Sequence, residues 1–284
     1  MERPAAQAPR CASCNTPLKG RFCHKCGERR LFPGDLHLRH YAGQVVNALT
    51  FAESKLWRSL LLLITKPGEL TLAWSEGRRV NHMRPIALFF LANVLYFLAP
   101  FINTFVADFE NHTHLQWYSE WARETAEEKR LEQNRTPAEF AAEFNRRNTA
   151  NAKLLIILLA AVTALPLALL HPIRSKPFAT HLTMGFELYS FTLLVNMLAV
   201  GGLLILIARI AQVLGHDITP YMGESLITPL FLLLTGQFLY RAERRLYQSS
   251  WWAALLRTVA IFAASWVLVV IYRWLQFTIT LAFM

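Results

Sequence analysis

Residues 152–170 read Ala-Lys-Leu-Leu-Ile-Ile-Leu-Leu-Ala-Ala-Val-Thr-Ala-Leu-Pro-Leu-Ala-Leu-Leu, an apolar run whose one charged side chain is Lys153. At about 1.5 Å per residue, a helix of this length crosses most of a hydrocarbon core about 30 Å thick. The whole chain is 54% hydrophobic and 17% charged, against about 45–50% and about 25% in soluble domains. The run therefore predicts a membrane-spanning helix in an all-α integral membrane bundle.

Four other apolar stretches reach the length of about 20 residues that a spanning helix requires. They lie on both sides of the run 152–170 in the sequence, and polar segments separate the spans from one another. We therefore expect a bundle over residues 86–284, with spans at about 86–106, 152–170, 182–208, 221–240 and 253–272.

Charge sets the predicted orientation of these spans. Residues 1–84 carry fourteen Lys and Arg against six acids, whereas residues 107–151 carry six against nine. The loops 171–181 and 241–252 are also more basic than 209–220. Because basic loops are retained on the cytoplasmic side, we expect a cytosolic amino terminus. The first 40 residues also lack the continuous apolar core of a secretory signal peptide.

Residues 107–151 are then an extramembrane insertion, and their pattern is helical. Thr136-Pro-Ala-Glu139 matches a capping box with proline at the first helical position. The charged, periodic stretch 117–134 precedes it. We expect a hairpin of two helices outside the membrane, and we interpret the alternating His112 and His114 as a polar turn rather than a weak metal site.

Residues 31–85 predict cytosolic and interfacial amphipathic helices. The run Glu53–Ile64 is too short to span and places its large apolar side chains on one face. Lys66-Pro67-Gly68 should end this helix, and a second short one should follow from Glu69 to Glu76. Three arginines, Arg78, Arg79 and Arg84, then precede the first span. They orient that span, and they are candidate contacts for lipid phosphate.

All four cysteines of the chain lie near its amino terminus, in two Cys-x-x-Cys pairs: Cys11, Cys14, Cys23 and Cys26. This spacing is typical of a four-thiolate zinc site, so we predict a zinc ribbon over residues 1–30 with a structural zinc ion. Disulfide pairing is the alternative, disfavoured in the reducing cytosol. We expect Asn15 to adopt left-handed backbone and Phe22 to be the core residue of the ribbon.

Ionisable residues inside a membrane span are candidates for function. Glu187 is an acid in the interior of the third predicted span, and Gln237 and Arg241 of the fourth span lie at a similar depth. We therefore expect an intramembrane polar cluster in which Glu187 pairs with Arg241, either as a structural salt bridge or as part of a transport path.

The order of motifs resembles a bacterial membrane family catalogued as domain of unknown function 3667. The resemblance covers roughly residues 11–100 and rests on the two cysteine pairs with Phe22 and Gly27, the Leu-rich helix, Lys66-Pro67-Gly68, Gly77-Arg78-Arg79 and Pro85. It implies a multi-pass protein of the bacterial inner membrane with a zinc ribbon, and it implies no activity.

The chain carries none of the common hydrolase, metalloprotease or phosphate-loop motifs. We therefore expect no catalytic residues and no enzyme activity. The leading hypothesis is an adaptor or regulator that presents the ribbon to a cytosolic or membrane protein partner. The alternative is a small transporter or lipid-handling protein. Membrane lipids are expected to bind, and nucleic acid is not, because the ribbon lacks stacking aromatic residues.

Overall fold

The computed structural model describes residues 10–11, 14–26, 54–78, 80–99, 104–171, 176–216, 218 and 224–284. The chain divides into two compact units, Met1–Ser54 and Lys55–Met284. The ribbon boundary predicted at residue 30 lies outside the described residues and stays a prediction.

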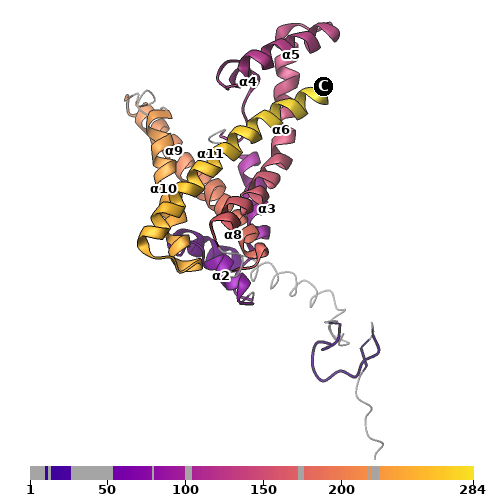
Figure 1. Ribbon diagram of the computed structural model, residues 1–284, viewed down its shortest axis with the longest axis vertical. Helices are drawn as coiled ribbons and strands as arrows, with labels where there is room; N and C mark the ends of the chain where they lie inside the picture. Colours follow the sequence, from indigo (N-terminus) through magenta and orange to yellow (C-terminus); the bar gives the residue numbers. More distant parts are fainter. Residues whose placement is uncertain are drawn as a thin grey trace, which may run out of the picture. The chain divides into compact units, whose positions relative to one another are not determined.

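The second unit is built from helices (Figure 1). Residues 54–65 are helical. They are followed in chain order by α2 (Glu69–Ser75), α3 (Pro85–Leu98), α4 (Phe109–His114), α5 (Ser119–Glu132), α6 (Pro137–Val162), α7 (Ala164–Leu170), α8 (Phe178–Phe191), the π-helix η2 (Thr192–Val200), α9 (Gly201–Val213), α10 (Glu224–Leu246) and α11 (Trp251–Ala282).

Three helical stretches in the described chain are long and apolar enough to cross a membrane: Pro137–Leu170, Phe178–Val213 and Trp251–Ala282. They contain the second, third and fifth predicted spans. The first predicted span begins as expected, but α3 ends at Leu98 after 14 residues, and residues 104–108 are not helical. The fourth predicted span corresponds to α10, whose last turn contains Arg244 and Arg245. The helices thus fit a membrane protein, and a topology of five spans stays a prediction.

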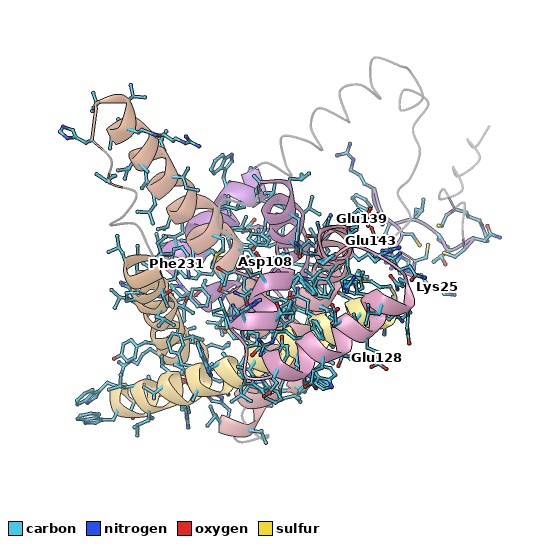
Figure 2. The ribbon with its side chains drawn as sticks, turned by 90° about the horizontal axis from the view of Figure 1, so that it is seen from above. Lys25, Asp108, Glu128, Glu139, Glu143 and Phe231 are labelled. Atoms are coloured by element: carbon cyan, nitrogen blue, oxygen red, sulfur yellow. The ribbon has the colours of Figure 1, made fainter. Side chains whose placement is uncertain are left out.

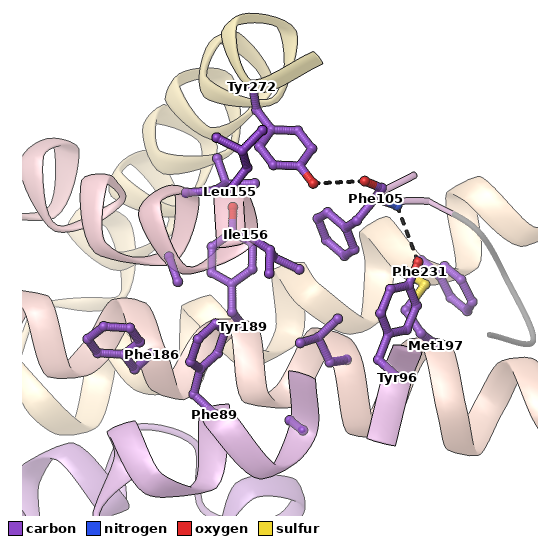
Figure 3. Close-up of a cluster of buried hydrophobic side chains, with 14 residues drawn as sticks. Phe89, Tyr96, Phe105, Leu155, Ile156, Phe186, Tyr189, Met197, Phe231 and Tyr272 are labelled. Atoms are coloured by element: carbon purple, nitrogen blue, oxygen red, sulfur yellow. Dashed lines mark hydrogen bonds between the residues drawn. The ribbon is translucent and has the colours of Figure 1, made fainter. Parts of the chain in front are cut away.

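The main core forms where α3, α6, α8, η2 and α11 pack together around aromatic residues (Figure 3). Gly185 allows the backbones of α8 and α6 to approach closely, because a Cβ atom at this position would lie 2.4 Å from the carbonyl oxygen of Ala160 in α6. At one edge the Tyr272 hydroxyl donates to the carbonyl of Phe105 at 2.8 Å, and the Phe105 N–H donates to the Tyr96 hydroxyl at 3.3 Å. These two hydrogen bonds hold the non-helical segment 104–108 against α3 and α11.

A second core joins the short helices to the long ones. Leu63 of the helix 54–65 and Leu70 of α2 are buried with Leu88, Phe238 and Ile261. Trp57, Leu61 and Ile64, on the other face of the helix 54–65, are more than half exposed. This helix therefore packs on the bundle with one face and leaves an apolar face free, as an interfacial helix should.

The predicted hairpin of the insertion is α5 and the first half of α6. Thr136 accepts from the Glu139 N–H and the Glu139 side chain accepts from the Thr136 N–H, so the predicted capping box is present. Carboxylates such as Glu128, Glu139 and Glu143 lie on these two helices (Figure 2). The insertion was expected to end near residue 151, yet α6 continues without a break into the apolar stretch.

The polar turn expected at His112 was wrong, because this residue lies in α4 and is fully buried. Its Nδ1 atom is 2.7 Å from the Tyr118 hydroxyl, beside Phe144 and Phe277. Burial lowers the pKa of His112 to about 4, so the imidazole is neutral at physiological pH. Phe277 and Leu281 come from the end of α11, and α11 therefore continues past Arg273 and supports the hairpin.

Candidate functional site

The four cysteines form one cluster in the first unit. Their sulfur atoms all lie within 4.8 Å of one another, with Cys11 and Cys26 at 3.5 Å and Cys14 and Cys23 at 3.5 Å. A disulfide bond would require about 2.05 Å, so the four cysteines form no disulfide bond with one another. A tetrahedral ion about 2.3 Å from each sulfur would set the sulfurs about 3.8 Å apart. The donor set and its spacing therefore fit a metal ion.

Local backbone geometry places these sulfurs. Asn15 has a φ of 58°, which confirms the predicted left-handed residue after the first pair. Its N–H donates to the Cys11 carbonyl, and the Cys11 N–H donates to Thr16, closing a tight turn. The Cys14 sulfur is 3.2 Å from the Thr16 hydroxyl, and this hydrogen bond lowers the pKa of the thiol to about 6. Cys14 is thereby prepared to bind metal as a thiolate.

The expected role of Phe22 was wrong. Its side chain is 62% exposed, whereas Leu18 is buried with Cys11 and Cys23. Leu18 is the apolar side chain that packs with these cysteines in the described part of the unit. Phe22 is left as an exposed aromatic residue on the surface of the metal centre.

Glu187 of α8 is a buried ionisable residue that lies against the start of α2. Its side chain is fully buried. One carboxylate oxygen accepts from the Gly68 N–H at 2.8 Å, and the other accepts from the Thr71 N–H at 2.8 Å. Gly68 is the N-cap of α2 and has no side chain to cap it. Glu187 therefore supplies, from another helix, the oxygen that a capping residue usually provides.

Gly68 is required where it stands. Its φ is 81°, a conformation that costs other residues energy. A Cβ atom there would also lie 3.1 Å from the Cα atom of Ala242 in α10. The neighbouring Pro67 carbonyl accepts from Arg245 at 3.2 Å. The Lys66-Pro67-Gly68 turn is thus held by α8 on one side and α10 on the other.

The expected pairing of Glu187 with Arg241 and Gln237 is not what the structure contains. Arg241 and Gln237 are exposed, and no ion pair joins Glu187 to Arg241 among the described residues. The two helices do pack together, but the α2 turn occupies the space beside the carboxylate. Backbone N–H groups therefore satisfy Glu187 in place of a guanidinium.

A second buried network, which sequence reasoning missed, joins the ends of α7, α10 and α11. His171 Nδ1 is 2.7 Å from the Leu167 carbonyl, and Nε2 is 3.0 Å from the Glu243 carboxylate. Because a carbonyl only accepts, Nδ1 carries a hydrogen, and one further proton lies between Nε2 and Glu243. Arg257 donates to Ser249, which contacts the same carboxylate.

Aromatic stacking surrounds this pair. The ring of Tyr247 lies 3.6 Å from that of His171, at an interplanar angle of 18°. Its hydroxyl is 2.8 Å from His181 Nδ1. Burial raises the pKa of Tyr247, so the hydroxyl stays protonated. The one sequence signal was an acid, Glu243, among the arginines of the basic segment 241–252.

The predicted phosphate contacts differ from one another in their surroundings. Arg78 is bound to Glu69 at 3.1 Å and to Glu76 at 2.7 Å. Arg84 is exposed at the N-cap of α3. Arg79 lies outside the described residues. The structure thus brings Arg78 and Arg84 to one end of α3, and Arg78 is already paired.

Comparison with known proteins confirms the family resemblance. The family described as protein of unknown function (DUF3667) matches residues 53–97. No curated protein and no solved structure matches the chain. The matched segment holds the helix 54–65, the Lys66-Pro67-Gly68 turn, α2 and α3, and therefore the backbone that Glu187 caps.

Replacing Glu187 by Gln should destabilise the second unit. The amide has one acceptor oxygen for two N–H donors and turns its own N–H toward one of them. We expect a loss of about 1–3 kcal/mol, seen as a lower thermal unfolding midpoint of the detergent-purified protein. Glu76→Gln, at an exposed position at the end of α2, is the matched control and should change little. Equal midpoints for wild type and Glu187→Gln would show that the capping contact is unimportant.

Proposed function

Starting from the family match and the cysteine centre, we propose that the chain is a non-enzymatic membrane adaptor. Its helical unit anchors it in the bacterial inner membrane, and its zinc ribbon faces the cytosol and binds a protein partner. The observation that carries this proposal is the cluster of four sulfurs within 4.8 Å of one another. Four protein ligands close a tetrahedral site, and closed sites serve structure, whereas catalytic zinc keeps a position for water or substrate.

Zinc is the ion that this donor set favours, because four thiolates in a short ribbon are a common structural zinc site. A unit whose described core is Leu18 and two cysteines gains its folding energy from the metal. The exposed Phe22, with Lys19, Arg21 and Lys25 also exposed around it, then gives the folded ribbon an aromatic and basic surface for a partner.

A transporter or lipid-handling protein is the second candidate, favoured by the buried Glu187 and by the His171–Glu243 pair. The capping of α2 weighs against Glu187 as a gate, since moving this carboxylate would leave two backbone N–H groups unpaired. In a transporter, Glu187→Gln would abolish flux at unchanged protein level, whereas in an adaptor its effect is limited to stability.

The purified protein should contain one zinc ion per chain, measured by elemental mass spectrometry. Cys23→Ser should lower this content sharply because it removes one of four ligands, and the helical unit should remain in the membrane. His24→Ala, an exposed neighbour of two cysteines, should keep the metal. An iron–sulfur absorption spectrum, or full zinc content in Cys23→Ser, would refute the assignment.

The proposed orientation is tested by reporters fused to the full chain. A reporter at Gly20 should be active only in the cytosol, and one at Thr125, in the insertion, only outside. The reason is the retention of basic segments on the cytoplasmic side. Activity of the Gly20 fusion outside the membrane would reverse the topology.

The adaptor role predicts a partner that depends on the folded ribbon. A photo-crosslinking amino acid at position 22 should capture one protein in intact cells, and Cys23→Ser in the same chain should abolish this capture. The same probe at Trp117, which is 73% exposed in the insertion, is the control and should not capture that protein. Capture that survives Cys23→Ser would contradict a role for the zinc ribbon.

A further inference from the structure

A small open cavity lies beside the start of α3, where α2 meets the loop that precedes α3. It is a shallow, half-open depression whose enclosed space is about 10 Å³, so a bound group would lie across its mouth. Leu70, Ala73, Trp74 and Met83 give it apolar walls, and Arg78, His82 and Arg84 line it with polar groups. The combination of cations with an apolar floor is suited to an amphiphile with an anionic head.

The cavity is built on a fixed backbone. The Met83 N–H donates to the hydroxyl of Ser59 at 2.8 Å, and Ser59 is fully buried in the helix 54–65. The other wall is α2, which Glu187 caps. The loop carrying His82 and Arg84 is therefore held in place by both neighbouring elements.

Two polar groups of the cavity have no partner in the described chain. The side chain of Arg84 is exposed and makes no hydrogen bond or ion pair with another described residue. His82 Nδ1 is buried and lacks a hydrogen-bond partner. Arg78, by contrast, is neutralised by Glu69 and Glu76. A ligand that accepts hydrogen bonds would satisfy Arg84 and His82, while Arg78 forms the wall.

The local balance of charge is positive. Arg58 and Arg78 both act electrostatically on His82, and Arg245 shares Glu69 with Arg78. With Arg84, four arginines face two carboxylates, those of Glu69 and Glu76. The amino-terminal end of α3 adds further positive potential, so an anionic group is favoured.

An apolar stripe leads away from the cavity along α3. Ile86, Phe90, Val94 and Leu98 are each at least 44% exposed and follow one another at intervals of four residues, so they lie on one face of the helix. In a bilayer such a face contacts acyl chains, whereas Arg84 at its end lies where headgroup phosphates are found. Because the apolar face of α3 begins next to Arg84, the surface favours a phospholipid over a free phosphate ion.

We propose that this cavity binds the phosphate of an anionic phospholipid, with Arg84 as the main ligand and His82 as a second donor. The acyl chains lie along Ile86, Phe90 and Val94. The proposal is independent of the zinc ribbon and of its partner. Of the three arginines expected from the sequence to contact lipid phosphate, the proposal assigns this role to Arg84, and it adds His82.

Native mass spectrometry of the full chain in detergent tests the proposal. Phosphatidylglycerol or phosphatidylcholine is added to the micelles at equal concentration. The wild type should retain one phosphatidylglycerol in preference to phosphatidylcholine. Arg84→Gln should weaken this retention about tenfold, the effect of losing a charge-assisted hydrogen bond. Arg84→Lys should restore part of it, and His82→Leu should cause a smaller loss.

Arg244→Gln is the matched control, because Arg244 is an exposed arginine in the last turn of α10. It should change retention less than about twofold. Equal losses for Arg84→Gln and Arg244→Gln would show diffuse attraction and overturn the site. Displacement of the lipid by millimolar inorganic phosphate, or phosphate binding in phosphatidylcholine alone, would assign the cavity to free phosphate and also overturn the proposal.

Discussion

The buried carboxylate of Glu187 is the contact on which the arrangement of the second unit depends. It satisfies two backbone N–H groups at the start of α2 that would otherwise be buried without partners. The same contact holds the Lys66-Pro67-Gly68 turn between α8 and α10. The family-matched segment contains this turn. The Lys66-Pro67-Gly68 motif therefore has a physical explanation: its backbone places the N–H groups where they donate to a carboxylate from a distant helix.

Features set by neighbouring residues could be predicted from the sequence. The capping box at Thr136 and Glu139 depends on side chains three positions apart. The cysteine cluster depends on two tight turns, and the left-handed Asn15 follows from the short spacing. Apolar length likewise located three of the stretches that are able to cross a membrane. In each case the signal lies within one short, continuous stretch of sequence.

Features set by distant backbone could not be predicted. Arg241 was the natural side-chain partner for Glu187, but the true donors are backbone N–H groups more than 100 residues away, and backbone donors leave no mark in the residue pattern. His171 and Glu243, 72 residues apart, are joined only by the packing of helix ends. Phe22 was misplaced because hydrophobicity alone does not say which of two apolar residues, Phe22 or Leu18, fits between the sulfurs.

The long helices α6 and α11 have 26 and 32 residues, about 39 and 48 Å at 1.5 Å per residue. They pack against each other, and the end of α11 supports the hairpin of the insertion. At the opposite end of α11, Arg257 belongs to the hydrogen-bonded chain that reaches His171. Because α11 is one continuous helix, a single rigid element supports the hairpin at one end and carries Arg257 of the His171–Glu243 network at the other.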